Sequence, residues 1–373
     1  MRSFAPVVKG LRHLSEYEQI MTTELQRVSA ALSEHFASIL VGSEKMGPLF
    51  HQFYTNIRDY MMRGGKRLRP LLTVIGYKAI SDQPAPANLY RVSCAVEFLH
   101  NGSLLHDDLI DRDETRRGGP TVHALYRDWA AKTRGAAPDR AAEFGAAMAI
   151  LSGDSVLNMG AELIASSGLD PTTCVECMRH YQAAYHELVD GVLLEMVMVH
   201  DTETSTASYL DMIRMKTAAL IEKSLLMGAT IAGASESQKS SLSVYATRVG
   251  QAFQIQDDIL GSFGDEKVTG KSADGDIREG KKTILVVKTN EMGSSEHRRI
   301  LRELLGKRDM TPEEVDQVRK VFVDSGALEA SRRLMLELLN EGQRSLGKAL
   351  PPLVEKYSKF LLDFSEFLVK RDY

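Results

Sequence analysis

Apolar residues recur through most of the chain at intervals of three and four, a spacing that places them on one face of an α-helix. In the segment 14–53 this spacing is carried by Leu25, Val28, Leu32 and Phe36. Glycine and proline fall between such stretches, and no long segment alternates apolar and polar residues as a strand would. Further helices are predicted at 145–165, 174–199, 209–228 and from 296 to the end. The pattern therefore predicts an all-α protein.

Length and composition are compatible with one large helical domain. The chain has 373 residues, of which 43% are hydrophobic, enough for a sizeable core. We expect a single domain over residues 1–373, with the motifs described below inside about 50–300. The formal net charge is −4, so no basic excess points to nucleic acid. No apolar run reaches the roughly 18 residues of a transmembrane helix, and residues 1–10 lack an apolar signal core.

The cysteines indicate a reducing, cytoplasmic setting. Cys94, Cys174 and Cys177 do not form a disulfide framework. Cys174 and Cys177 make a CxxC pair, but no second pair of ligands accompanies them as in a zinc site. We therefore expect no metal or redox role for these thiols.

The stretch 100–123 gathers much of the candidate chemistry. It contains a DDxxD cluster and the charged residues that follow it: Asp107, Asp108, Asp111, Asp113, Glu114, Arg116 and Arg117. In a helix Asp107 and Asp111 share one face, where like charges repel unless a cation lies nearby. Mg²⁺ is bound by oxygen ligands, typically one or two carboxylates plus substrate phosphates, and arginines bind further phosphate oxygens. A solvated acidic turn is the alternative for a lone DDxxD cluster.

Two further motifs weaken that alternative. Residues 254–258 read Gln-Ile-Gln-Asp-Asp and follow an apolar stretch. Upstream, residues 64–70 read GGKRLRP, in which two glycines allow backbone to approach a ligand beside three cationic side chains. Alone, this basic segment could equally be a helix start with Pro70 in its first turn.

With these motifs in view, the sequence resembles the trans-isoprenyl diphosphate synthase family. The basic segment 64–70, the DDxxD cluster with its trailing RRG, Lys216–Thr217 and FQIQDD at 253–258 occur in the family's order. The similarity runs from about residue 63 to about residue 283. It implies a single-domain, all-α bundle of the isoprenoid synthase type, with about ten or more helices around a deep central cavity. The two Asp clusters would face each other across the mouth of that cavity.

The resemblance implies a trans-prenyltransferase that joins isopentenyl diphosphate head-to-tail (1'-4) to an allylic diphosphate, which could be dimethylallyl, geranyl or farnesyl diphosphate. An allylic carbocation would form as pyrophosphate departs, and the released pyrophosphate would take the proton at the end. No side-chain nucleophile is needed, which agrees with the lack of a Ser/His/Asp or Cys/His set in the sequence. A homodimer is expected.

The resemblance also assigns site residues. Three Mg²⁺ ions per active site would be bound by the carboxylates of Asp107, Asp108, Asp111, Asp257 and Asp258. The catalytic set would be Asp107, Asp111, Asp257 and Lys216. Isopentenyl diphosphate would be held by Lys66, Arg69, His100 and Arg117. The other substrate contacts would be Arg116, Lys216, Thr217, Gln254, Lys271 and Lys281, with Lys216 and Lys271 at the allylic diphosphate and Asp276 in the outer shell of a magnesium ion.

Some features depart from the family pattern. The family's Gly-Gln-x-x-Asp is replaced by a segment with Val192 and Glu195. Val192 has no side-chain hydrogen-bonding group, so one contact to substrate or metal that the family makes is not expected here. Gly261 stands where the second cluster would have its third Asp. Residues 129–143 are predicted to be a surface insertion, either a neutral loop or a partner surface. Lys216 lies on an apolar background, so its burial would require an anion, which the resemblance supplies as the allylic diphosphate.

Product length is predicted from the residues just before the first Asp cluster. In the family a bulky aromatic four or five positions before the first Asp shortens the product, whereas this chain has Ser103 and Gly102 there. Leu99, further upstream, is moderately bulky and predicts a stop about one isoprene unit later. We therefore expect a geranylgeranyl product, with a longer or a farnesyl product as alternatives, and expect that Gly102→Phe would shorten it.

Two other classes of protein compete with this interpretation. A class I terpene cyclase also uses an Asp-rich magnesium site, but it has no reason to carry the basic segment 64–70 or to bind a second diphosphate. A non-catalytic subunit of a heteromeric synthase would be expected to have lost the DDxxD cluster, which is intact here. Incubation with both substrates and Mg²⁺ separates the three classes.

Overall fold

The computed structural model describes residues 15–199, 201, 204–264, 274–307 and 309–369. The helices are α1 (Glu16–Met46), α2 (Pro48–Met62), α3 (Leu68–Ile80), α4 (Ala87–Ile110), α5 (Val122–Arg134), α6 (Pro138–Ala165), α7 (Pro171–Met198), α8 (Thr206–Ile213), the π-helical turn η1 (Arg214–Ala218), α9 (Ala219–Ile231), α10 (Glu236–Phe263), α12 (Gly275–Glu279), α13 (Ile284–Met292), α14 (Ser295–Leu304), α15 (Pro312–Asp324), α16 (Ala327–Leu346) and α17 (Glu355–Val369). A two-residue antiparallel hairpin, β1 (Thr115–Arg116) and β2 (Gly119–Pro120), follows α4. The predicted all-α fold is confirmed.

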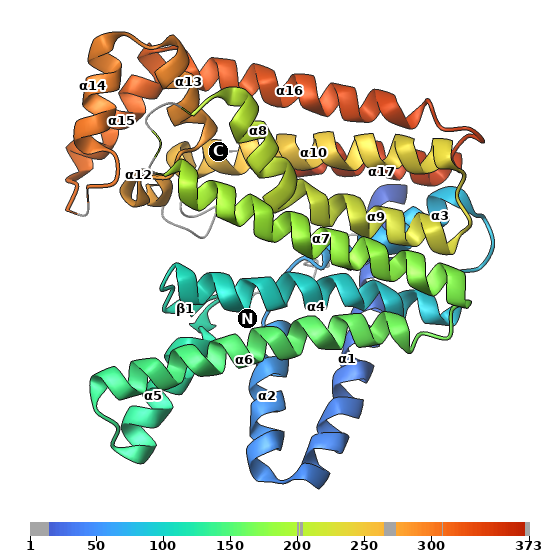
Figure 1. Cartoon of the computed structure of the whole chain (residues 1–373). Coiled ribbons are helices and arrows are strands. Elements are labelled where there is room, and N and C mark those ends of the chain that lie inside the picture. The colour runs from blue at the N-terminus through green and yellow to red at the C-terminus, as the bar shows by residue number, and fades with distance from the viewer. Residues whose placement is uncertain (1–14, 200, 202–203, 265–273, 308, 370–373) are drawn as a thin grey trace, which may run out of the picture.

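The two large hydrophobic cores lie side by side and share helix α9. One core is built around α10, α13, α16 and α17, and the other around α2, α4, α6 and α7. Leu225 of α9 is buried in the first core, and Leu220 and Met227 are buried in the second. Figure 1 shows α10 and α16 running together in one half of the molecule and α4 and α6 together in the other. α9 therefore joins the halves that carry the two Asp clusters.

Two glycines allow α3 and α9 to cross closely. A Cβ added at Gly228 would lie 1.8 Å from the carbonyl oxygen of Thr73, and one at Gly76 would lie 2.1 Å from that of Leu225. No side chain fits at these distances, so the backbones themselves are in contact. This contact fixes the position of α3, which begins directly after the basic segment.

The first predicted helix is interrupted. The segment 14–53 was expected to be one helix, but α1 ends at Met46 and α2 begins at Pro48. Gly47 between them has φ of +111°, and proline is well tolerated at the first position of a helix. The two helices form an antiparallel pair that projects from the bundle (Figure 1).

The predicted insertion at 129–143 is helical rather than a loop. α5 runs to Arg134 and α6 starts at Pro138, so only residues 135–137 connect them. Gly135 ends α5 in the left-handed conformation with φ of +63°, and Pro138 occupies the first turn of α6. A C-terminal glycine and an N-terminal proline are the usual signs of two abutting helices.

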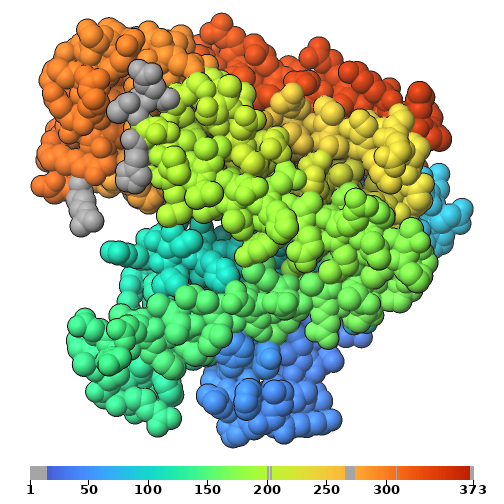
Figure 2. All heavy atoms as spheres, in the orientation of Figure 1, coloured from blue at the N-terminus to red at the C-terminus, as the bar shows by residue number. Residues whose placement is uncertain are grey.

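Both acidic helix ends lie at the same end of the bundle. In Figure 1, α4 and α10 run in the same direction and end at the left, where β1 and α12 follow them. Figure 2 shows the surface hollowed on this side, between the segment of α4–α6 and that of α12–α15. Within the described residues no helix is long and apolar enough to cross a bilayer.

Candidate active site

The last turn of α4 carries the first acidic cluster. Asp111 directly follows α4, and its backbone N–H donates to the carbonyl oxygen of Asp107 at 2.8 Å. Burial and the charge of Asp107 raise the pKa of Asp111 to about 6, whereas Lys281 and Lys216 oppose that rise. Two carboxylates that repel each other at a helix end form a place that a cation would stabilise.

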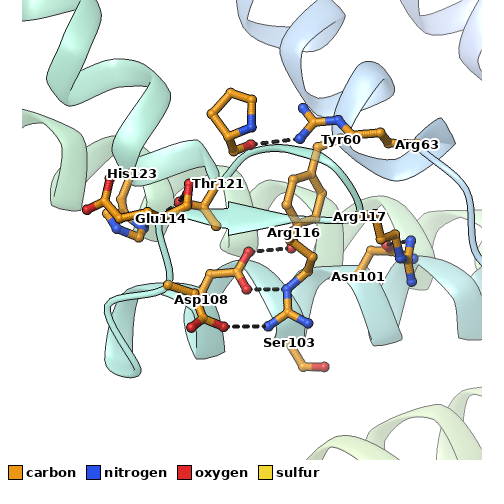
Figure 3. Close-up of polar contacts among 12 residues, drawn as sticks. Tyr60, Arg63, Asn101, Ser103, Asp108, Glu114, Arg116, Arg117, Thr121 and His123 are labelled. Atoms are coloured by element: carbon orange, nitrogen blue, oxygen red, sulfur yellow. Dashed lines mark hydrogen bonds and ion pairs between the residues drawn. The ribbon is translucent and has the colours of Figure 1, made fainter. Parts of the chain in front are cut away.

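Asp108 is directed into the protein instead (Figure 3). The residue is 1% exposed, and its carboxylate accepts a hydrogen bond from Tyr60 Oη at 2.7 Å and pairs with Nε of Arg116. Arg116 also donates to Asp113 at 3.2 Å. Because each oxygen of Asp108 already has a donor within the protein, this carboxylate anchors the end of α4 to α2 and to the hairpin.

The hairpin after α4 presents two arginines, Arg116 and Arg117. Arg117 has left-handed backbone with φ of +51° at the turn of the hairpin. Arg127 of α5 anchors the segment before the hairpin, since its two Nη atoms donate to the carboxylate of Glu114 at 2.6 and 2.7 Å. Arg63 holds the far strand by donating to the Pro120 carbonyl at 2.7 Å (Figure 3). Contacts from two helices thus hold the short hairpin in place.

The end of α10 repeats the arrangement of α4. Asp258 is 6% exposed and accepts hydrogen bonds from Tyr209 Oη at 2.6 Å, from Gln254 Nε2 at 3.0 Å and from the backbone N–H of Ile284 at 3.1 Å. Burial, followed by the charge of Asp276, raises the pKa of Asp258 to about 7. In both clusters the second Asp is therefore bonded to a buried tyrosine from another helix. The role of Asp108 and Asp258 as metal ligands stays a prediction.

Lys216 and Thr217 lie on the π-helical turn η1. Nζ of Lys216 pairs with Glu195 of α7, and Thr217 Oγ1 donates to Gln254 Oε1 at 2.8 Å. The side chain of Lys216 is 31% exposed, so it is not deeply buried. Glu195 thus supplies an anion for Lys216 within the protein, and the contact of Lys216 with the allylic diphosphate stays a prediction. The family departure at position 195 therefore bears directly on a candidate substrate lysine.

Asp276 occupies the space that Gly261 leaves open. A Cβ at Gly261 would lie 2.2 Å from Oδ2 of Asp276, at the start of α12. Nζ of Lys281 lies 3.5 Å from Asp276 and 2.7 Å from Glu279. Burial lowers the pKa of Lys281, but these two carboxylates outweigh it and raise the pKa above its usual value. Lys271, also predicted to contact substrate, lies outside the described residues.

The two arginines of the basic segment have different environments: Arg67 is bonded within the protein, whereas Arg69 has a donor that a ligand could bind. Arg67, at the start of α3, is 9% exposed and donates to Glu97 and to the carbonyl oxygen of Met61. Arg69 has a buried Nε with no hydrogen-bond partner in the described part of the chain, and burial lowers the pKa of its guanidinium. Nζ of Lys66 lies 5.4 Å from the ring centre of Phe367. A buried donor without an acceptor is a group that a ligand oxygen would satisfy.

Charges from distant segments act on one another at this end of the bundle. Asp111 of the first cluster is influenced by Lys216 and Lys281, which belong to the second half of the chain. Arg69 is influenced by Glu97, Arg117 and Asp257, in that order. Burial, followed by the charges of Arg69 and Arg117, lowers the pKa of His100 well below its usual value. The structure thus brings Asp107 and Asp111 together with Lys216 and Lys281, and Arg69 and Arg117 together with His100 and Asp257, whereas Lys271 lies outside the described residues.

The predicted product-length positions face a neighbouring helix. A Cβ at Gly102 would lie 2.8 Å from Cγ of Leu157 on α6, so position 102 is not open space. Ser103 Oγ donates to the carbonyl oxygen of His100 at 2.8 Å, and Leu99 is fully buried in the second core. At this level the space beside α4 is therefore occupied by a side chain of α6.

Four polar residues at the site did not stand out in the sequence: Tyr60, Glu97, Asn101 and Tyr209. Glu97 and Asn101 lie four apart in an apolar part of α4, and a charge in such a place requires a buried partner. That spacing was a signal that could have been used. The two tyrosines carry no local signal, because their partners are Asp108 and Asp258 on other helices.

Known proteins share this architecture. The chain matches the model of the polyprenyl synthetase family over residues 51–322. A short chain isoprenyl diphosphate synthase of Methanocaldococcus jannaschii is 35% identical over 274 residues, which cover 74% of this chain and 77% of that protein. A geranylgeranyl diphosphate synthase of Sulfolobus acidocaldarius is 34% identical over 314 residues, covering 83% of this chain and 87% of that protein.

A solved structure is similar over almost the whole chain. The geranylgeranyl pyrophosphate synthase of Corynebacterium glutamicum, in complex with isoprenyl diphosphate and magnesium, gives a TM-score of 0.83 at 27% identity and covers 95% of this chain and 99% of its own. The helical fold and the paired acidic helix ends place the chain among the isoprenyl synthases. In particular, the chain belongs to the polyprenyl synthetase family.

Proposed function

We propose that the chain is a magnesium-dependent trans-prenyltransferase that condenses isopentenyl diphosphate with an allylic diphosphate. The observation that carries this function is the separation of charges at one end of the bundle. Carboxylates and lysines from α4, η1 and the segment after α12 influence one another, while a second cationic cluster, Arg69 and Arg117 beside the neutral His100, lies next to them. Two polyphosphate substrates, which together carry roughly five to six negative charges, need two such regions.

Magnesium fits the donors of the acidic region. All the candidate ligands are carboxylate oxygens, and the mutual repulsion of Asp107 and Asp111 is relieved by a cation. We assign ligation of three ions to Asp107, Asp111 and Asp257, with Asp108 and Asp258 holding the two helix ends in position. Bound magnesium would neutralise the diphosphate that departs from the allylic substrate.

The protein's own groups would orient the two substrates. Lys216, Lys281 and Arg116 face the allylic diphosphate, and Thr217 and Gln254 hold η1 to α10 beside it. The C–O bond of the allylic diphosphate breaks, and the double bond of isopentenyl diphosphate attacks the allylic cation to form a C–C bond. The departing diphosphate then accepts the proton lost from the new chain. Lys66, Arg69, His100 and Arg117 hold isopentenyl diphosphate in line, so positioning supplies much of the rate.

The product is proposed to be geranylgeranyl diphosphate, made from dimethylallyl, geranyl or farnesyl diphosphate as primer. The similarity to geranylgeranyl diphosphate synthases supports this length. Leu157 of α6 closes the space beside Gly102, which supports a stop near this level rather than a much longer chain.

The chain is proposed to act as a homodimer. Large apolar side chains are exposed on α6 and α7, where a second copy could cover them: Ile150, Leu151, Leu193 and Met196, with exposed fractions of 48 to 61%. Sedimentation equilibrium of the full chain would test this state.

The activity is tested by incubation with isopentenyl diphosphate, each allylic primer and Mg²⁺, with pyrophosphate release and product length as readouts. Asp107→Ala and Asp257→Ala should each lower turnover by several orders of magnitude without loss of helical content. Asp59→Ala, at an exposed ion pair with Arg58, is the matched control and should keep wild-type turnover. Cyclic hydrocarbon products, or full turnover in EDTA, would contradict the proposal.

A further inference from the structure

A buried carboxylate lies among the cations of the proposed isopentenyl diphosphate region. Glu97, in the middle of α4, is 3% exposed. Its Oε1 pairs with Nη1 of Arg67 and accepts a second hydrogen bond from Asn101 Nδ2 at 2.9 Å. Asn101, which is fully buried, also donates to the Glu97 carbonyl oxygen at 2.8 Å. Oε1 of this carboxylate is thus held between Arg67 and Asn101.

The same network reaches the hairpin. Nη1 of Arg117 donates to Asn101 Oδ1 at 3.4 Å (Figure 3). On its other side the Arg117 guanidinium packs against Gly65, where an added Cβ would lie 3.2 Å from its Cζ. The guanidinium of Arg117 is thus held between α4 and the glycine loop, although the residue comes from the tip of a two-residue hairpin.

The network also holds the basic segment. Arg67 has left-handed backbone with φ of +49°, a conformation that is strained for a non-glycine residue. Its guanidinium joins Glu97 of α4 to the Met61 carbonyl at the end of α2. Lys66 and Arg69 flank this fixed point. One carboxylate therefore orders both halves of the cationic region, the segment 64–70 and the hairpin.

We propose that Glu97 and Asn101 are positioning residues for isopentenyl diphosphate, which set the orientation of Arg67 and Arg117 without touching substrate. This inference rests on the proposed function. It opposes a simpler expectation from charge alone, because removal of a negative charge beside an anion site should strengthen anion binding. For Glu97→Gln the positioning role therefore predicts weaker binding of isopentenyl diphosphate, whereas the argument from charge alone predicts tighter binding.

The experiment uses the full chain with Asn101→Leu, which removes three hydrogen bonds and keeps the branched shape of the side chain, and Glu97→Gln, which removes the charge. Asn56→Leu, which breaks a hydrogen bond of 3.0 Å to Tyr126 away from the site, is the control. Isopentenyl diphosphate affinity is measured by calorimetry in EDTA and as KM with Mg²⁺, beside the KM for farnesyl diphosphate and the unfolding midpoint. Both site variants should bind isopentenyl diphosphate about tenfold or more weakly, a loss of about 1.4 kcal/mol, with the farnesyl KM within about twofold of wild type.

The outcomes separate the alternatives. Unchanged or tighter binding of isopentenyl diphosphate by Glu97→Gln would overturn the positioning role. Equal rises in both KM values, with a lowered unfolding midpoint, would reduce the network to a purely structural one. If Asn101→Leu does not fold, Glu97→Gln alone shows whether the affinity for isopentenyl diphosphate falls or rises. If the wild type binds isopentenyl diphosphate but forms no product, the proposed function is contradicted. The binding measurements would still test the positioning role of Glu97 and Asn101.

Discussion

Arginines separated by two positions in the basic segment have different environments. Arg67 is bonded to Glu97 and to a backbone carbonyl, whereas the buried Nε of Arg69 has no acceptor among the described residues. Residue type alone could not distinguish the two, because both are arginines beside the same glycines. The resemblance to a family assigned Arg69 to substrate, and its environment in the structure supports that choice.

The two cationic regions should be separable by kinetics. Arg69→Ala should raise mainly the KM for isopentenyl diphosphate, and Lys216→Ala mainly that for the allylic substrate, each by about tenfold or more, since a charge-assisted phosphate contact is lost. Arg58→Ala, which removes a surface arginine paired with Asp59, should change neither value. Steady-state kinetics with each substrate varied in turn measures the effect. Identical profiles for the Arg69 and Lys216 variants would refute the assignment of two regions.

Because Gly261 and Asp276 are in contact, substitutions at the two positions should affect turnover in a coupled way. Gly261→Asp should reduce turnover, because its Cβ would overlap the carboxylate of Asp276 and add a like charge beside it. Asp276→Asn should also reduce turnover and weaken Mn²⁺ binding, measured by electron paramagnetic resonance. In the double variant the repulsion between like charges is removed but the overlap remains, because asparagine fills the same space as aspartate, so only the charge part of the losses should be recovered. Additive losses in the double variant would show that the two positions do not share one role.

At the scale of elements, the sequence predicted most helices, but not how they join. The periodicity at 145–165 and 174–199 was confirmed, because an amphipathic face is a local property. Gly47–Pro48 is a local sign of a helix end inside a segment predicted as one helix, and Gly135 with Pro138 favoured an insertion over 129–143 although they mark only a short junction between α5 and α6. The Tyr–Asp pairs and the packing of Leu157 against Gly102 depend on tertiary contacts, which no local pattern contains.

The crossing of α3 and α9 should tolerate no side chain at its glycines. Gly228→Ala places a methyl 1.8 Å from the Thr73 carbonyl oxygen, so the helices must separate, at a cost of about 1–3 kcal/mol or more in the free energy of unfolding. Gly42→Ala is the matched control, since a Cβ there meets no atom within 4 Å, and a gain of up to about 1 kcal/mol is expected from helix propensity. Urea unfolding measures both. Equal stability of the two variants would contradict the close crossing.

The packing of α6 on α4 predicts that α6 limits the length of the product. Leu157→Ala should open the space beside Gly102 and shift products to longer chains, whereas Gly102→Phe must displace Leu157 and should shorten products only with a loss of stability. Ile150→Ala, on the same helix but with Ile150 48% exposed, should leave product length unchanged. Chromatography of the dephosphorylated products gives the distribution. Products of unchanged length from Leu157→Ala would exclude α6 as the limit.

At the scale of the whole molecule, stability depends on α9, because it belongs to both cores. His180 of α7 contacts this helix, with Nε2 at 3.2 Å from Thr230 Oγ1. Burial, followed by the charge of Lys223, lowers the pKa of His180 to about 4. Above pH of about 6.5 the imidazole is neutral in both the folded and unfolded states, and below that value only the unfolded chain binds the proton until about pH 4.

Folding stability should therefore fall with acidification through this window, by up to about 1.4 kcal/mol per pH unit from His180 alone. His180→Gln removes the titration and should lose about 2 kcal/mol less than wild type between pH 6.5 and pH 5. Urea unfolding of both proteins at the two pH values gives the difference, and measurements at pH 7 and pH 8 serve as the control, where the proteins should respond alike. Parallel losses of stability on acidification would show that His180 has no depressed pKa.

The π-helical turn η1 takes up one extra residue between two helices. α8, η1 and α9 are continuous, and η1 contains one residue more per turn than an α-helix would. Deletion of a single residue within 214–218 would restore an uninterrupted α-helix with little rotation of α8 relative to α9, because the wide turn takes up its extra residue within about the same rotation. Tyr209 would then stay near Asp258, whereas the side chains within the turn, Lys216 among them, would change their direction. In this segment the length of the chain, counted in single residues, is as much a determinant of the active site as the identity of Lys216.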